Sequence, residues 1–278
     1  MHNVTKCLVY SQLLATHPAE FLDRMEVHWE KLTQKLREQT VPKATYPMAC
    51  RMKEGVAALS SALGRDLTTI LNEPQLQEVQ VHIAHSMRTV GDAPDHPFPL
   101  YFNADPTLAQ LSYLLSRALR PGTVLETGVA YGATSASILA GLRKNQKGTL
   151  YSIDLPPIAD RVGTNIGALV PKEWASQWRL YRGSSKRLMP YLIQNVTGPI
   201  DLFIHDSANL EGVQTMELET VWPHLGPDGA ILMNNVGGNH AFADFVRAHA
   251  IAHHFVIEQT LNEGHLTGVI LRKDERLN

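Results

Sequence analysis

The chain has 278 residues, 44% of them apolar, and a formal net charge of −2 at pH 7. Lys and Arg total 25 against 27 acidic residues, so no basic surface is available to neutralise a nucleic-acid backbone, and nucleic acid is not an expected partner. Apolar runs are too short for a membrane span, residues 1–10 lack a secretion-signal pattern, and Cys7 and Cys50 are too few for a disulfide framework. We therefore expect a cytoplasmic chain.

Residues 1–100 are predicted to form a helical cap or dimerisation region. Apolar and charged residues recur at helical spacing over 18–40, with the charged ones on a wetter face. The larger apolar side chains of this helix suggest a face that needs a partner, and they include Phe21, Met25 and Trp29. We therefore expect a homodimer built largely from residues 1–90.

A second helical pattern covers 65–87, with a break expected at Glu73-Pro74 because the residue before a proline disfavours the helical conformation. The proline-rich stretch 91–99 is predicted to be a linker. Asp105 and Pro106 supply an N-cap and a first-turn proline for a helix that reaches about Arg120. The second domain is therefore predicted to occupy residues 101–278.

From residue 123 onward, apolar strand patterns alternate with helical ones. The expected strands are 123–127, 149–154, 178–183, 200–205 and 229–234. A final hairpin is expected, with strands at 255–260 and 265–271 around the turn residues Asn262 to Gly264. This alternation predicts an α/β fold in which helices cover both faces of a parallel sheet.

A glycine turn follows the first of these strands. Gly128 and Gly132 precede a helix whose first turn carries Thr134, an arrangement that lets a carboxylate or phosphate reach backbone N–H groups. Asp154 ends the second strand, where nucleotide-binding α/β units place an acid for ribose hydroxyls. Ala130 stands where a pyrophosphate-binding turn has its second glycine, which argues against a dinucleotide. The alternative is a turn in which glycine serves packing alone.

Several segments, taken together and in order, resemble class I S-adenosylmethionine-dependent methyltransferases over roughly residues 105–275. They are Glu126–Ser135, Tyr151–Pro156, Trp178–Ser185, Ile200–Ser207 and Trp222–Asn235. Within that class the chain is most similar to bacterial small-molecule methyltransferases whose fourth strand ends in a His-Asp-Ser motif. The resemblance implies a Rossmann-like, doubly wound, mostly parallel seven-stranded sheet whose last strand inserts antiparallel, and S-adenosylmethionine as cofactor.

The resemblance also implies a set of cofactor-binding residues. The glycines of the turn would approach the methionine portion, Thr134 would receive its carboxylate, Asp154 would bind the ribose, and Leu155 would lie against the adenine. Ser184 would belong to an adenine-contacting turn, with a plain capping turn as the alternative. The full set is Glu126, Gly128, Tyr131, Gly132, Thr134, Ser135, Asp154, Leu155, Gly183, Ser184 and Asp206.

The expected catalytic residues are His240, Asp206 and Asn235. A carboxylate at a strand end needs a cation or several donors to offset its desolvation, which marks Asp206 as functional. Relatives that methylate vicinal hydroxyls combine this Asp with an Asp-Asp or Asp-Asn pair to hold Mg²⁺, whereas this chain has Asn234 and Asn235. We therefore expect no metal. His205 should point away from Asp206, because side chains alternate along a strand.

Relatives usually place a basic His three residues after this Asp, where the chain has Asn209. His240, just past the fifth strand, is the candidate replacement as general base, and a loop or capping His is the alternative.

These residues predict methyl transfer to a small-molecule acceptor, plausibly in specialised metabolism, with oxygen slightly favoured over nitrogen or carbon. An acceptor that is already nucleophilic would need no base, because the sulfonium already carries the charge. The alternative is a methyltransferase fold that binds the cofactor but catalyses other chemistry or serves as an assembly partner.

Overall fold

The computed structural model describes residues 3–37, 43–91, 105–155, 157 and 165–273, and it contains a seven-stranded sheet in the order β3-β2-β1-β4-β5-β7-β6. The strands are β1 (Thr123–Thr127), β2 (Thr149–Asp154), β3 (Trp178–Arg182), β4 (Ile200–His205), β5 (Leu225–Met233), β6 (His254–Glu258) and β7 (Leu266–Leu271). The first five are parallel, and β7 runs antiparallel to both of its neighbours. The predicted doubly wound fold and antiparallel last strand are confirmed.

Both faces of the sheet are apolar, because successive side chains of the central strands pack into opposite cores. In β4, Leu202 and Ile204 join one core and Phe203 joins the other. In β5, Leu232 and Ile231 divide in the same way. Strands buried on both sides read as continuous apolar runs, which is how they were recognisable in the sequence.

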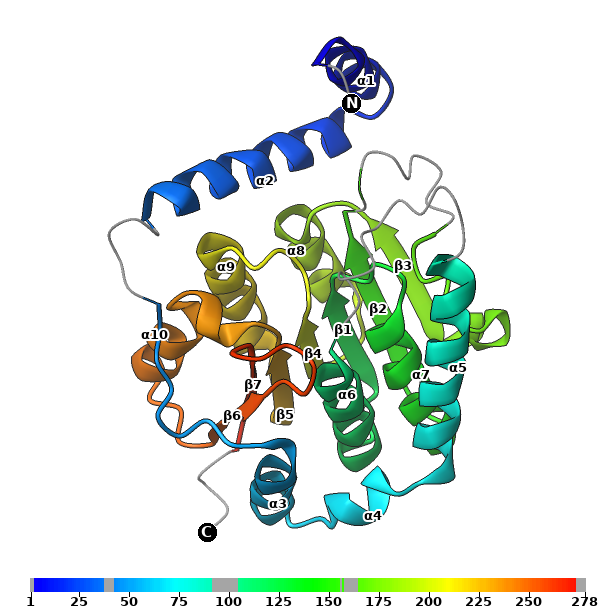
Figure 1. Cartoon of the computed structure of the whole chain (residues 1–278), viewed down its shortest axis with the longest axis vertical. Helices are drawn as coiled ribbons and strands as arrows, with labels where there is room; N and C mark the ends of the chain where they lie inside the picture. Colours follow the sequence, from blue (N-terminus) through cyan, green and yellow to red (C-terminus); the bar gives the residue numbers. More distant parts are fainter. Residues whose placement is uncertain (1–2, 38–42, 92–104, 156, 158–164, 274–278) are drawn as a thin grey trace.

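Helices cover the two faces separately (Figure 1). On one side lie α6 (Pro106–Leu119) and α7 (Ala133–Asn145), and on the other α8 (Ser185–Asn195), α9 (Glu211–Val221) and α10 (Ala241–Ala248). Short 3₁₀ turns occur at η2 (Lys172–Gln177), η3 (Trp222–His224) and η4 (Val236–Gly238). The Asp105 side chain accepts the Thr107 N–H at 2.8 Å, so the predicted N-cap of α6 is confirmed.

The N-terminal region forms α1 (Asn3–Thr16), α2 (Pro18–Arg37), α3 (Met52–Leu63), α4 (Leu67–Leu71) and α5 (Pro74–Gly91). The break expected at Glu73-Pro74 is present, since α4 ends at Leu71 and α5 begins at Pro74. Helices α3 to α5 share one apolar core with the sheet, to which they contribute Val56, Leu59, Leu67, Leu76 and Val79. In Figure 1, α1 and α2 lie at the other end of the molecule, where α2 runs over α8 and α9.

Helix α2 contacts the rest of the chain through polar side chains. Glu20 pairs with Arg182 at 2.9 Å, and Gln34 accepts the Glu211 N–H at 2.9 Å. A separate face carries exposed apolar side chains at alternating spacings of three and four residues. This α2 stripe consists of Leu22, Met25, Trp29, Leu32 and Leu36, which are 64%, 43%, 68%, 45% and 68% exposed. Phe21, expected on this face, is instead half-buried and packs edge-on against Tyr10 of α1.

Some expectations differ from the structure or fall outside it. Strand β5 begins at Leu225, four residues before the expected start, because Leu225 is buried and pairs with Ile200 despite the Gly-Pro-Asp-Gly sequence that follows. Most of the expected linker 91–99 lies outside the described residues. None of the helices in the described ranges is long and apolar enough to cross a membrane.

Candidate active site

The glycine turn between β1 and α7 lies against the end of β4. Gly128, Ala130 and Gly132 all have positive φ, at 84°, 47° and 94°. A Cβ on Gly128 would come within 2.1 Å of the Asp206 carbonyl oxygen, and one on Gly132 within 2.8 Å of the Gly167 Cα. Both glycines are therefore required by close approaches within the protein. The sequence pattern found the turn but assigned its glycines to a ligand.

Asp154 is the last residue of β2, as predicted, and it lies beneath this turn. Its Oδ2 accepts the backbone N–H groups of Val129 and Ala130, each at 2.7 Å. The residue is only 8% exposed. A carboxylate that is held by the turn at one edge of the sheet is fixed in place before any ligand arrives.

Asp206 follows β4 and faces the first turn of α7. Its Oδ2 accepts from the Thr134 hydroxyl at 3.3 Å, and its Oδ1 accepts from the Asn234 amide at 2.7 Å. Burial is the main cause that raises the pKa of Asp206 to about 7. The Asp154 charge raises it further, and Asn234, His205 and Thr134 oppose the shift. Such a carboxyl changes charge near neutral pH, which suits proton transfer.

Asn234 presents nitrogen to Asp206, since its Oδ1 accepts from Gln259 Nε2 at 2.6 Å. Mg²⁺ requires oxygen ligands. Here the Asn234 N–H lies beside Asp206, where a second oxygen ligand would be needed. The neighbouring Asn235, half-buried with φ 54°, begins the η4 turn. Within the described ranges no cluster of three or more His, Cys, Asp or Glu residues could hold a metal ion. The donor set therefore does not fit a divalent cation.

Glu126 is buried between β1 and α7. Its Oε2 accepts from Ser135 Oγ at 2.7 Å and from Ser152 Oγ at 2.6 Å, so it joins β1, α7 and β2. Burial raises the pKa of Glu126 to about 8; the two serine hydroxyls oppose this shift, and the charges of Asp206 and Asp154 add to it. These contacts tie the first turn of α7 to β1 and β2.

His205 has partners of its own, on the α9 side of the sheet. Its Nδ1 lies 2.7 Å from Glu217 Oε2, which also accepts from the Thr127 hydroxyl at 2.6 Å. Ser207 donates to the other oxygen of Glu217 at 2.9 Å. As expected from strand alternation, His205 does not join Asp206 at the edge. This buried network fixes the ends of β1 and β4 relative to each other.

The remaining predicted site residues lie at the same edge. Tyr131 is fully buried with Val129, Ala133, Ile166 and Leu169. Leu155 follows β2 and is half-buried, and Gly183 and Ser184 follow β3. His240 is half-buried at the N-terminus of α10.

Ser184 is held by the N-terminal helix. Its N–H and hydroxyl donate to Asp23 of α2 at 3.0 and 2.7 Å, while its Oγ caps α8 by accepting from Arg187 N at 3.4 Å. The sequence pattern missed Asp23, because no local signal marks a pair separated by 161 residues. It also missed the segment after β2, in which Gly167 N and Leu169 N donate to the carbonyls of Ala130 and Tyr131 at 2.9 Å each.

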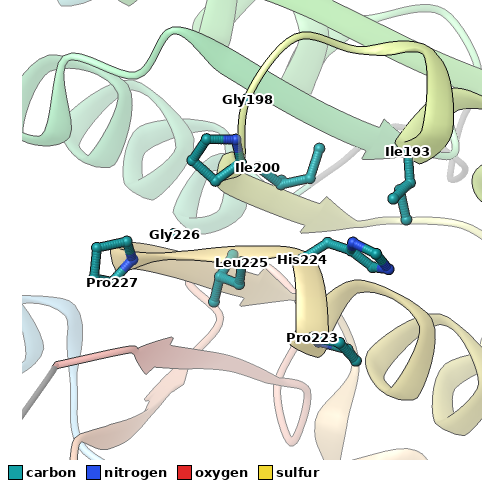
Figure 2. A pocket seen from close by; sticks show the side chains of 9 residues that line it. Ile193, Gly198, Ile200, Pro223, His224, Leu225, Gly226 and Pro227 are labelled. Carbon is teal, nitrogen blue, oxygen red and sulfur yellow. The ribbon is translucent and has the colours of Figure 1, made fainter.

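Two hollows lie elsewhere on the surface. Figure 2 shows a cavity of about 320 Å³ lined by residues at the starts of β4 and β5, including Ile200, His224 and Leu225. Because the strands are parallel, this is the edge of the sheet opposite to Asp206. A second hollow, of about 490 Å³, lies between α9 and α10. Neither hollow is lined by Asp154 or Asp206.

Comparisons with known proteins agree with this fold. Residues 125–236 match the family model of a methyltransferase domain. The fold resembles that of the O-methyltransferase TomG from Streptomyces achromogenes, involved in tomaymycin synthesis and solved in complex with S-adenosylmethionine. The identity is 18%, the alignment covers 80% of this chain and 99% of TomG, and the TM-score is 0.50.

Two further solved structures share the fold. A candidate O-methyltransferase from Klebsiella pneumoniae is 16% identical with a TM-score of 0.51, and 80% of this chain and 99% of that one are covered. The O-methyltransferase NovP is 15% identical with a TM-score of 0.50, and the alignment covers 72% of this chain and 100% of NovP. No curated protein matches the chain.

Proposed function

We propose that this chain is an S-adenosylmethionine-dependent methyltransferase acting on a small molecule. The observation that carries the proposal is the placement of Asp154, the glycine turn and Asp206 at one edge of the sheet, within a matched methyltransferase domain. Ligands of open α/β sheets bind outside the carboxyl ends of the strands, which is this edge. The structures of TomG with S-adenosylmethionine and of other O-methyltransferases of the same fold support the cofactor and the reaction class.

In this proposal each residue has a limited task. S-adenosylmethionine, when bound, supplies a methyl group on a positively charged sulfur. Asp154 accepts the ribose hydroxyls, Leu155 lies against the adenine, and the first turn of α7 receives the methionine carboxylate. Asp206 and Asn235 orient the acceptor. Because the charge is already on the cofactor, orientation and exclusion of water provide much of the acceleration.

We propose oxygen as the methylated atom and His240 as the base that takes the acceptor's proton. The relatives that share the fold and are O-methyltransferases support oxygen, and TomG's part in tomaymycin synthesis supports a place in specialised metabolism. The motif His205-Asp206-Ser207 supports a position among bacterial small-molecule methyltransferases. Metal independence is supported by the Asn234 amide that faces Asp206. The alternative remains a cofactor-binding protein with non-methyl chemistry or an assembly role.

The α2 stripe supports a homodimer, since its alternating spacing of three and four residues is that of a helix that packs against another helix. We propose a cytoplasmic protein in which residues 1–100 cap the acceptor site or dimerise and residues 101–278 bind the cofactor. Helix α2 lies over α8 and α9, which supports a capping role.

Calorimetry with S-adenosylmethionine tests the cofactor assignment. Asp154→Ala should weaken binding by about 10–100-fold, because hydrogen bonds to a charged acceptor contribute about 1.5–3 kcal/mol. Asp201→Ala is a matched control: Asp201 also accepts two backbone N–H groups, from Gly122 at 2.6 Å and Thr123 at 3.0 Å, but at the opposite edge. Equal affinities for the two variants would refute the assignment of Asp154.

A further inference from the structure

The amide of Asn234 is the first member of a chain of side-chain amides that leads into the β6–β7 hairpin. Gln259 Nε2 donates to Asn234 Oδ1 at 2.6 Å and to Thr267 Oγ1 at 3.3 Å. Asn262 Nδ2 donates to Gln259 Oε1 at 3.2 Å and to Asp105 Oδ2 at 3.3 Å. We call Asn234, Gln259 and Asn262 the amide relay.

When Asp206 is charged, the relay has one direction, because a carboxylate terminates it at each end. Asp206 accepts from its first member, and Asp105 accepts from its last. Asp105 also accepts the N–H groups of Thr107, Thr260 and Leu261, so its oxygens serve only as acceptors. Hydrogen bonds led by that from Thr107 outweigh the effect of burial and lower the pKa of Asp105, which keeps it charged.

Reversing any one amide would place like groups against each other. A turned Asn234 would bring its oxygen against the Asp206 carboxylate and its nitrogen against Gln259 Nε2. Turning Gln259 as well would bring its nitrogen against Asn262 Nδ2, and turning Asn262 would break its bond to Asp105. Asn234 and Gln259 are only 9% and 7% exposed, so water offers little compensation at these two residues, whereas Asn262 is exposed.

We propose that Gln259 and Asn262 are positioning residues that hold the Asn234 amide with its nitrogen toward Asp206, and that this orientation keeps a divalent cation out of the acceptor site. The inference rests on the proposed function only in treating Asp206 as part of that site. A cation beside Asp206 would meet the positive end of the amide dipole instead of an oxygen ligand. Nothing in the local sequence around Asp206 indicates this control, since the hairpin is more than fifty residues further along the chain.

Gln259→Glu tests the proposal by removing, with little change in shape, the N–H donor that faces Asn234 Oδ1. The new carboxylate can only accept, and Asn262 and Thr267 can both still donate to it. With a cation beside Asp206, Asn234 can then turn its oxygen toward the cation and its nitrogen toward the carboxylate at position 259, an orientation that the Gln259 amide opposes in the wild type. Gln177→Glu is the matched control, because Gln177 donates to Gly148 O at 3.0 Å on η2, away from the hairpin.

Two measurements on the full chain report the result. The first is the side-chain amide signal of Asn234 in protein labelled with ¹⁵N-asparagine, assigned by its loss in Asn234→Ser. It should shift when Asp206→Asn is introduced into the wild type. The second is calorimetry with Mn²⁺. We expect at least tenfold tighter binding by Gln259→Glu than by the wild type or Gln177→Glu.

The proposal is overturned if Gln259→Glu binds Mn²⁺ no more tightly than the wild type. It is also overturned if the wild type binds Mn²⁺ and loses this binding in Asp206→Asn. Should Gln259→Glu fail to fold, the wild-type amide signal still decides the orientation, because a signal that does not respond to Asp206→Asn would exclude it. Neither measurement depends on methyl transfer, so failure of the proposed function would leave this test intact.

Discussion

His240 and Asp206 are the two candidates that we propose for the group that takes the acceptor's proton. If His240 is the base, His240→Ala should lower kcat by about 10²–10⁴-fold while the affinity for S-adenosylmethionine stays nearly unchanged. The measurement is a turnover assay paired with calorimetry. His224→Ala, at the opposite edge of the sheet, is the control and should retain wild-type turnover.

The pH profile separates the two candidates. Because the pKa of Asp206 is raised to about 7, its carboxyl gains charge as the pH rises through that value, and a rate that needs the carboxylate should rise with it. Two results together would identify Asp206 as the general base. They are full turnover in His240→Ala and, in Asp206→Asn, loss of the rise in rate with increasing pH. Full turnover in both variants would indicate an acceptor that needs no base.

Glu126 should make the protein less stable at alkaline pH. Its folded pKa of about 8 exceeds the ordinary 4.5, so its contribution to stability is present below about pH 4.5 and is lost as the pH rises through 8. A pKa shift of this size lowers the free energy of unfolding by about 4 kcal/mol between pH 5 and pH 9. Urea unfolding at both pH values should show a smaller decrease for Glu126→Gln than for the wild type.

Glu54→Gln, on the exposed surface of α3, provides the comparison and should leave the pH dependence as it is. An identical decrease in Glu126→Gln and the wild type would show that Glu126 is already charged in the folded protein at pH 5.

At the scale of elements, Asp23 is the most buried of the carboxylates that attach α2 to α8 and β3. Asp23, 4% exposed, accepts from Ser184 and from Arg187 Nη2 at 2.7 Å. Asp23→Ala should release α2, lower the free energy of unfolding by about 1–3 kcal/mol and expose residues 3–37 to proteases. Glu26→Ala removes a more exposed pair with Lys186 and should have a smaller effect. Equal protease resistance in wild type and Asp23→Ala would contradict the anchoring role.

The same contact should weaken in acid. Burial raises the pKa of Asp23, but the hydrogen bonds from Arg187 and Ser184 outweigh it and the net pKa is lowered. The stabilisation is therefore present above about pH 4 and is lost as the pH falls through the folded value.

The sequence predicted most elements of the sheet because the central strands are short apolar runs bounded by turn residues. It placed Asp154 and Asp206 at one edge, since parallel strands end together. It could not predict that Ser184 is held by Asp23, or that Gln259 controls Asn234, because these pairs join distant segments through side chains with no periodic pattern. The start of β5 was missed because Pro227 and Gly229 usually mark a turn.

At the scale of the whole molecule, the α2 stripe predicts self-association. Light scattering at micromolar concentration should give a dimer for the wild type and a monomer for Trp29→Glu, since the charge would be buried in the interface. Met48→Glu is the matched control, because Met48 is 87% exposed and lies outside the stripe. A wild-type monomer would refute the homodimer, and a dimer of Trp29→Glu would place the interface elsewhere.

The polar attachment of α2 makes ionic strength a variable for this protein. Most of a domain is held by apolar burial, which salt does not weaken, but α2 contacts α8 and the end of β3 through Glu20, Asp23 and Glu26. The pair of Glu26 with Lys186 is the most exposed of these three, and exposed charges are screened over about 10 Å at 0.1 M salt and about 3 Å at 1 M, whereas buried pairs such as that of Asp23 are screened less. High salt should therefore weaken the Glu26 contact of α2 first and leave the sheet folded, and dilute buffer should strengthen the same contact.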